Sequence, residues 1–141
     1  MTLRARLVQL FAVLTLAVGS LVALPAQPAA AANGCNGSVI AWNEWRDSAG
    51  RLAAKTYYYD EGANTCVNLV AQGIYYGQSK YMAIKLCDSY NTGCVTDSGT
   101  FLYYAGPVRR PADVCMWAVS TMKNSAGTTI VNKSTYVPPC N

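Results

Sequence analysis

The stretch Lys80-Tyr-Met-Ala-Ile-Lys-Leu-Cys87, which continues as Asp88-Ser-Tyr-Asn-Thr-Gly-Cys94, indicates the fold most directly. In its first part Met82, Ile84 and Leu86 alternate with the other residues, and this period of two is typical of a β-strand. Its second part is a run of turn-forming residues between two cysteines. We therefore expect a loop between two strands, closed at its base by a Cys87–Cys94 disulfide.

Short strand-like runs separated by turn signals extend through the rest of residues 33–141. Val, Ile, Thr, Tyr and Trp, which favour strands, are common there, and Asp97–Gly99 and Pro107–Pro111 are among the expected turns. Asp113–Met122 is apolar on both faces, which indicates a central strand. We predict an all-β domain, a small antiparallel sandwich or barrel of about seven short strands. The expected strands span residues 38–45, 51–59, 65–71, 80–87, 100–105, 113–122 and 128–137.

Six cysteines predict three disulfides and no free thiol, because the number is even and the chain carries an export signal. Once Cys87 and Cys94 are paired, two arrangements of the other four stay open. One is Cys35–Cys66 with Cys115–Cys140, and the other is Cys35–Cys115 with Cys66–Cys140. The sequence has no closely spaced cysteine pair and no histidine, so we expect neither a metal site nor a cofactor.

The first 32 residues have the order of a secretory signal peptide. Arg4 and Arg6 precede the apolar run Leu7–Leu24, and small residues lead to a cleavage site after Ala32. A membrane anchor and a lipid anchor on Cys35 are the alternatives. The small-residue region with no basic residues after it disfavours the membrane anchor, and Ala32-Asn33-Gly34 lacks the aliphatic residue that normally stands three before a lipidated cysteine. We expect a single secreted domain over residues 33–141, with no membrane attachment once the leader is removed.

Removal of the leader changes the charge of the chain. Residues 1–32 hold two of the eleven basic residues and no acid, so the net charge falls from +4 to +2. The remaining basic residues are scattered and form no stripe, which argues against nucleic acid as a partner.

Catalytic groups are scarce. The absence of histidine excludes Ser-His-Asp and Cys-His nucleophile systems, and a serine nucleophile would then need a lysine base. The acidic pairs Glu44 with Asp47 and Asp60 with Glu61 lie at or beside expected turns, where acidic residues are common. We therefore predict that the protein is not an enzyme.

Aromatic residues are the richest candidates for function. Adjacent tyrosines in a strand point to opposite faces, so we expect at least one of each pair to be exposed. Trp42 and Trp45 should also lie on opposite faces, which would place only one of them in the core. Exposed Tyr and Trp are frequent in protein interfaces and sugar-binding surfaces. The candidate binding patch comprises Trp42, Trp45, Tyr57, Tyr59, Tyr75, Tyr76, Tyr103 and Tyr104.

Several short motifs resemble the spore-associated protein A family of small secreted actinobacterial proteins. The most specific is Tyr103-Tyr104-Ala105-Gly106-Pro107-Val108, preceded by Asp97-Ser98-Gly99 and followed by Cys115-Met116-Trp117. The likeness extends to Asn33-Gly34-Cys35, to Tyr58-Tyr59 ahead of Asn64-Thr65-Cys66-Val67, and to the cysteine near the C-terminus. The resemblance implies a secreted, disulfide-bonded β domain found with spores or the cell surface, and it supplies no catalytic residues.

The sequence thus predicts a secreted binding or structural protein whose partner is another secreted or cell-surface protein. Two alternatives stay open. A secreted inhibitor of proteases or other hydrolases would present the Cys87–Cys94 loop to its target, since the bridge makes that loop rigid. An adaptor subunit of a secreted antibacterial toxin assembly would dock on other chains of the particle.

Overall fold

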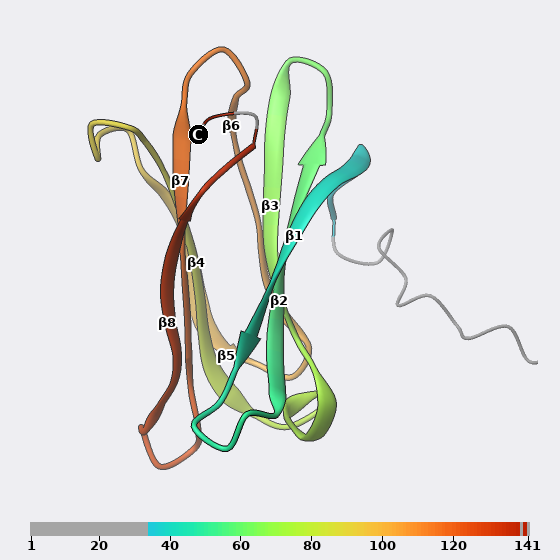
Figure 1. Cartoon of the computed structure of the whole chain (residues 1–141), viewed down its shortest axis with the longest axis vertical. Helices are drawn as coiled ribbons and strands as arrows, with labels where there is room; N and C mark the ends of the chain where they lie inside the picture. The colour runs from blue at the N-terminus through green and yellow to red at the C-terminus, as the bar shows by residue number, and fades with distance from the viewer. Residues whose placement is uncertain (1–33, 139, 141) are drawn as a thin grey trace, which may run out of the picture.

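Eight β-strands and one short 3-10 helix make up the computed structural model, which describes residues 34–138 and 140 (Figure 1). The signal peptide expected over residues 1–32 lies outside the described residues. The elements are β1 (Ser38–Arg46), β2 (Leu52–Asp60), β3 (Asn64–Ala71), η2 (Gly73–Tyr75), β4 (Lys80–Asp88), β5 (Val95–Phe101), β6 (Tyr104–Pro111), β7 (Met116–Lys123) and β8 (Thr129–Tyr136).

The strands form two four-stranded antiparallel sheets that face each other as two layers (Figure 1). The first sheet has the order β1-β2-β3-β6 and the second has the order β5-β4-β7-β8. The chain passes from one sheet to the other after β3, after β5 and after β6. The predicted all-β antiparallel fold is therefore confirmed, and of the two expected architectures it is the sandwich.

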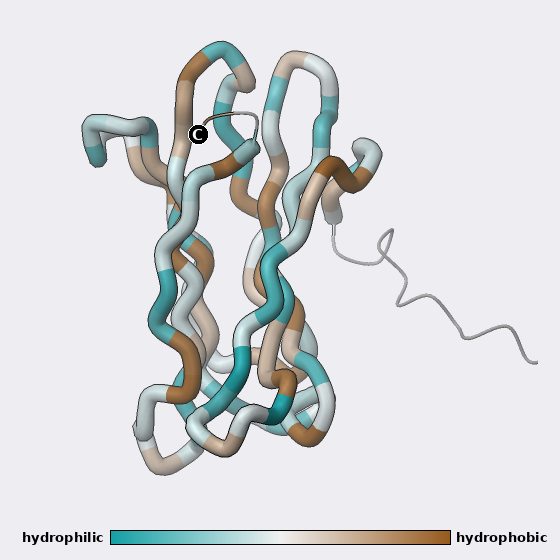
Figure 2. Tube along the Cα trace, in the orientation of Figure 1, coloured by the Kyte–Doolittle hydropathy of each residue, from teal (hydrophilic) through white to brown (hydrophobic). Residues whose placement is uncertain are grey.

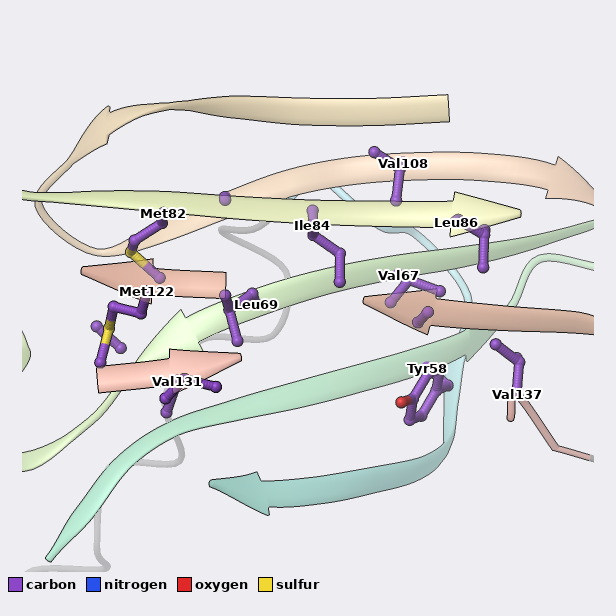
Figure 3. Packing of buried hydrophobic residues seen from close by; sticks show 14 of the residues in the cluster. Tyr58, Val67, Leu69, Met82, Ile84, Leu86, Val108, Met122, Val131 and Val137 are labelled. Atoms are coloured by element: carbon purple, nitrogen blue, oxygen red, sulfur yellow. The ribbon is translucent and has the colours of Figure 1, made fainter. Parts of the chain in front are cut away.

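The core lies between the sheets, where alternate side chains of each strand meet (Figure 3). Met82, Ile84 and Leu86 are fully buried, as their alternation predicted. Tyr58 and Leu69 face them from the first sheet. The expected central strand is β7, which pairs with β4 on one side and β8 on the other.

A short chain of polar groups crosses this interior. Trp45 Nε1 donates a hydrogen bond of 2.7 Å to Thr56 Oγ1, which lies 2.6 Å from Ser120 Oγ. Thr56 and Ser120 are fully buried, so the bonds satisfy groups that would otherwise be costly to remove from water. They also link β1, β2 and β7 across the two sheets.

Two expected turns are wrong, which is why eight strands form where about seven were predicted. Asp97–Gly99 lies inside β5 and Pro107 lies inside β6. Both are edge strands, where turn residues are tolerated because only one side of the strand is paired. Asp97 Oδ2 accepts a 2.6 Å hydrogen bond from the Gly106 backbone N–H, so its carboxylate joins the two edges. The true turn is at Leu102–Tyr103.

The three disulfides are Cys35–Cys66, Cys87–Cys94 and Cys115–Cys140. The predicted Cys87–Cys94 bridge between β4 and β5 is confirmed, and the other four cysteines adopt the first of the two open arrangements. Three intramolecular disulfides are consistent with an extracellular location. Within residues 34–138 and 140, no helix is long and apolar enough to cross a membrane.

Candidate functional site

The eight aromatic residues of the predicted patch do not share one surface. Trp42 lies opposite Tyr57 in the β1–β2 pairing, on the outer face of the first sheet. Tyr76 and Tyr103 lie together at the end of the sandwich where β4 begins, with ring centroids 4.9 Å apart. The other four, Trp45, Tyr59, Tyr75 and Tyr104, are buried or half-buried.

Tyr59 is not available for binding, which corrects the prediction. Its side chain is only 1% exposed, although its neighbour Tyr58 is fully buried in the core on the opposite face of β2. Tyr59 packs against Cys35 and Cys66 on the outer face of the first sheet. Adjacent tyrosines are thus both buried here because the disulfide brings the N-terminal segment over the outer face.

That N-terminal segment is held by charge as well as by the disulfide. Glu61 accepts hydrogen bonds of 2.8 Å from the Asn36 backbone N–H and from Arg109 Nε. Arg109 also donates to the carbonyl of Gly34. The hydrogen bond from Arg109 lowers the pKa of Glu61 below its ordinary value, with partial burial opposing it. These contacts hold the N-terminal segment in place over Tyr59.

Trp45, Tyr75 and Tyr104 also have structural roles. Of the two tryptophans in β1, Trp45 packs against the core and Trp42 is 56% exposed, as their spacing predicted. Tyr75 Oη donates a 2.8 Å hydrogen bond to Asp47 Oδ2, which ties the η2 loop to the β1–β2 turn. Tyr104 is half-buried in β6, opposite Val70.

Two further exposed apolar residues lie in the same two loops as Tyr76 and Tyr103. Ile74 is 58% exposed, Tyr76 53%, Leu102 46% and Tyr103 45%. We call these four residues the loop-end cluster. They come from the β3–β4 loop and the β5–β6 turn, and Figure 2 shows a hydrophobic segment in the β3–β4 loop at the lower end of the sandwich.

Backbone hydrogen bonds join the two loops that carry the cluster. The Gly77 N–H donates to Leu102 O at 3.0 Å, and the Ala71 N–H donates to Tyr103 O at 2.8 Å. Gly77 has a φ of +76°, which glycine adopts without strain. The four side chains are therefore displayed by loops whose backbones are fixed to each other.

Lys80 also links the β3–β4 loop to the β5–β6 turn. Its side chain is almost fully buried, and its ammonium donates to Gln78 O at 2.6 Å and to Leu102 O at 2.8 Å. Burial lowers the pKa of Lys80 below its ordinary value, because the charged form is removed from water. A buried cation thus couples one loop to the other.

Asp47 links a third loop, the β1–β2 turn, to the η2 loop at the same end of the sandwich. Its carboxylate accepts hydrogen bonds from the backbone N–H groups of Ala49 and Arg51, both at 2.9 Å, and from Arg51 Nε and Tyr75 Oη, both at 2.8 Å. Partial desolvation opposes ionisation, but these hydrogen bonds together hold the pKa of Asp47 at about 2. A charged Asp47 therefore fixes the η2 loop at neutral pH.

The acidic pairs weighed as catalytic groups have structural contacts. Glu44 forms an ion pair of 2.9 Å with Lys55 across β1 and β2. Asp60 Oδ1 accepts from the Gly62 N–H at 2.7 Å, while Asp47 and Glu61 serve as described above. The loop-end cluster itself contains no charged residue, so its chemistry suits binding of an apolar surface.

Ile74 and Leu102 are the members of the cluster that sequence reasoning missed. Ile74 lies in the short η2 helix beside Gly73, where a large aliphatic side chain among turn-forming residues was the only available signal. Leu102 lies within the strand expected over residues 100–105, and the sequence did not mark it as part of a turn.

Comparison of the chain with protein-family models, with curated proteins and with solved structures found no match. The resemblance to the spore-associated protein A family therefore stays a prediction.

Proposed function

We propose that this protein is a secreted, non-enzymatic binding protein that docks on another secreted or cell-surface protein through the loop-end cluster. The observation that carries the proposal is the exposure of four large apolar side chains, among them the Tyr76–Tyr103 pair, on two loops that are hydrogen-bonded to each other. An exposed group of this kind costs solubility, and such groups commonly mark interaction sites.

The chemistry of the cluster favours a protein partner. Aromatic side chains are enriched at the centres of protein interfaces, and charged residues are depleted there. Two tilted tyrosine rings flanked by Ile74 and Leu102 match that composition. Tyrosine contributes a large contact area for the loss of few rotatable bonds, so an apolar patch on the partner is the complementary surface.

The rigidity of the loops supports the same proposal. Lys80 and Asp47 hold the β1–β2, β3–β4 and β5–β6 connections together before any partner arrives. Binding then requires little ordering of the loops, which lowers the entropic cost of association. Loops placed on a rigid sandwich are a common arrangement for recognition. The family resemblance adds spores or the cell surface as the place of action.

The test is recovery of the native protein from culture medium with its partner, followed by reconstitution from the two purified proteins. Ile74→Ser with Tyr103→Ser should abolish the reconstituted complex, whereas Trp42→Ser should leave it intact. Trp42 is the matched control because it is equally exposed but lies on the outer face of the first sheet. A chain that stays monomeric at its natural concentration, or a complex that the double variant does not weaken, would refute the proposal.

A further inference from the structure

A second surface lies at the opposite end of the sandwich, on the outer face of the second sheet. Trp117 pairs with Cys87 on one side and with Tyr136 on the other, so the three side chains form a row across β4, β7 and β8. A cleft of about 280 Å³ opens there, between the ends of β7 and β8 and the Cys87–Cys94 loop. Figure 1 shows this loop projecting beside β7. The residues that line the cleft are Ser89, Asn91, Trp117, Ser134, Thr135 and Tyr136.

We propose that this cleft binds a neutral oligosaccharide. The proposal is independent of the loop-end cluster and of the protein partner assigned to it, because the two surfaces share no residue.

The lining has the two kinds of group that a sugar requires. The rings of Trp117 and Tyr136 offer electron-rich faces to the C–H groups of a pyranose. The hydroxyls of Ser89, Ser134 and Thr135 and the amide of Asn91 belong to residue types that both donate and accept hydrogen bonds. Small-molecule sites combine aromatic walls with a few polar groups in this way.

The loop that contributes Ser89 and Asn91 carries a third aromatic residue. Tyr90 lies between Ser89 and Asn91 in the loop and is 86% exposed. Tyr136 is 63% exposed. Exposure of this extent leaves both rings open to a chain of sugar units that extends beyond the cleft.

The charge of the site indicates that the ligand is neutral. None of the six lining residues is charged. Lys85 lies beside the site, with its ammonium 5.9 Å from the centroid of the Trp117 ring. Asp88, which precedes Ser89 in the loop, is paired with Arg110 Nη2 at 3.8 Å. A charged sugar would lose hydration without gaining a counter-ion among the residues that line the cleft.

The walls are fixed in place before any ligand binds. Asp88 Oδ1 accepts from the Tyr90 and Thr92 N–H groups at 3.1 and 2.7 Å, and the Ser89 N–H donates to Cys115 O at 2.9 Å. Asn91 adopts a φ of +58°, which Asn tolerates better than most residues. The loop is therefore tightly turned and is held by several hydrogen bonds.

Two disulfides flank the same walls. Cys87–Cys94 closes the loop, and Cys115–Cys140 ties the chain after β8 to the start of β7. The volume of the cleft is near the lower limit of about 300 Å³ for small-molecule sites, which suits one or two sugar units.

The experiment is a titration of the disulfide-intact protein, without its leader, with the β-1,4-linked trimers of glucose and of N-acetylglucosamine, followed by calorimetry. The trimer of galacturonic acid serves as the charged comparison. We expect one or both neutral trimers to bind with a Kd between micromolar and millimolar, and the charged trimer to bind more weakly. Trp117→Ala should weaken binding by roughly tenfold or more, and Tyr136→Ala by several-fold.

The variants separate this proposal from the proposed function. The loop-end double variant Ile74→Ser with Tyr103→Ser should bind the trimers as the unchanged protein does. Trp117 is half-buried, so if Trp117→Ala does not fold, the exposed Tyr136 and Tyr90 carry the test. Absence of binding by both neutral trimers at millimolar concentration, equal binding of the charged trimer, or unchanged binding in Tyr136→Ala with Tyr90→Ala would overturn the proposal. None of these results would affect the protein-docking assignment.

Discussion

Lys80→Met is the substitution that tests most directly how the loop-end cluster is held. Methionine keeps an unbranched side chain of similar length but has no ammonium group. Gln78 O would lose its hydrogen bond of 2.6 Å, and Leu102 O would lose its bond of 2.8 Å. The β3–β4 loop and the β5–β6 turn would then be joined by their backbone hydrogen bonds and by the contact between Tyr76 and Tyr103.

The expected loss of stability follows from these two contacts. A hydrogen bond to a charged group contributes about 1.5–3 kcal/mol, so two set an upper limit of roughly 3–6 kcal/mol. Two effects reduce the loss. Leu102 O still accepts from the Gly77 N–H, and the protein no longer removes an ammonium from water. We therefore expect Lys80→Met to lower the free energy of unfolding by about 2–4 kcal/mol.

Urea unfolding at neutral pH with the disulfides intact measures this difference. The matched control is Lys85→Met, because Lys85 lies in the same strand but on its outer face, where its ammonium lies 5.9 Å from the centroid of the Trp117 ring. The control should change stability by no more than about 0.5 kcal/mol. Equal stability of Lys80→Met and the unchanged protein would refute the role of Lys80 as the link between the loops. A folded Lys80→Met should also bind the partner more weakly, because the tyrosines would no longer be held in place.

Two further predictions concern the N-terminal segment and the response to acid. Gly37→Ala should lower the free energy of unfolding by about 1–3 kcal/mol in the same urea assay, because the added methyl would collide with the Asp60 backbone. Unchanged stability would show that the N-terminal segment is not held against β2. The pKa of Asp47 is lowered from its ordinary 3.8 to about 2 in the folded protein, so its stabilising effect is complete above pH 3.8 and is lost as the pH falls towards 2. Thermal unfolding across this range should show a decline that Asp47→Asn reduces, and an identical pH profile in the variant would contradict the assignment.

The strands could be predicted where burial of one face makes apolar residues alternate along the sequence. In β4 and β7 one face lies against the core, so alternation of Met82, Ile84 and Leu86 was enough to predict a strand. The prediction was wrong at Asp97–Gly99 and Pro107, where residues typical of turns occupy edge strands. Turn propensity is a local property, and whether a strand is an edge depends on the pairing of distant segments.

The aromatic site was predictable in part for a similar reason. Composition was sufficient to single out Tyr76 and Tyr103. It could not exclude Tyr59, because Tyr59 is buried by Cys35 and Cys66 and the pairing of these cysteines was one of two open arrangements. Had Cys35 been bridged to Cys115, no disulfide to Cys66 would have held it against Tyr59. The exposure of a strand residue thus followed from a covalent bond that the spacing of cysteines did not determine.

The two surfaces proposed for binding are held by different kinds of chemistry. At one end a buried ammonium and an ionised carboxylate fix the loops, and at the other end two disulfides flank the cleft. A domain of this size buries only a modest core, so its loops need constraints beyond packing. Charge-based constraints respond to pH and covalent ones respond to reductants. Reducing conditions therefore act first on the cleft, which makes the two surfaces separable in a single folded chain. Acid acts on both, because the Asp88 carboxylate also holds the cleft loop.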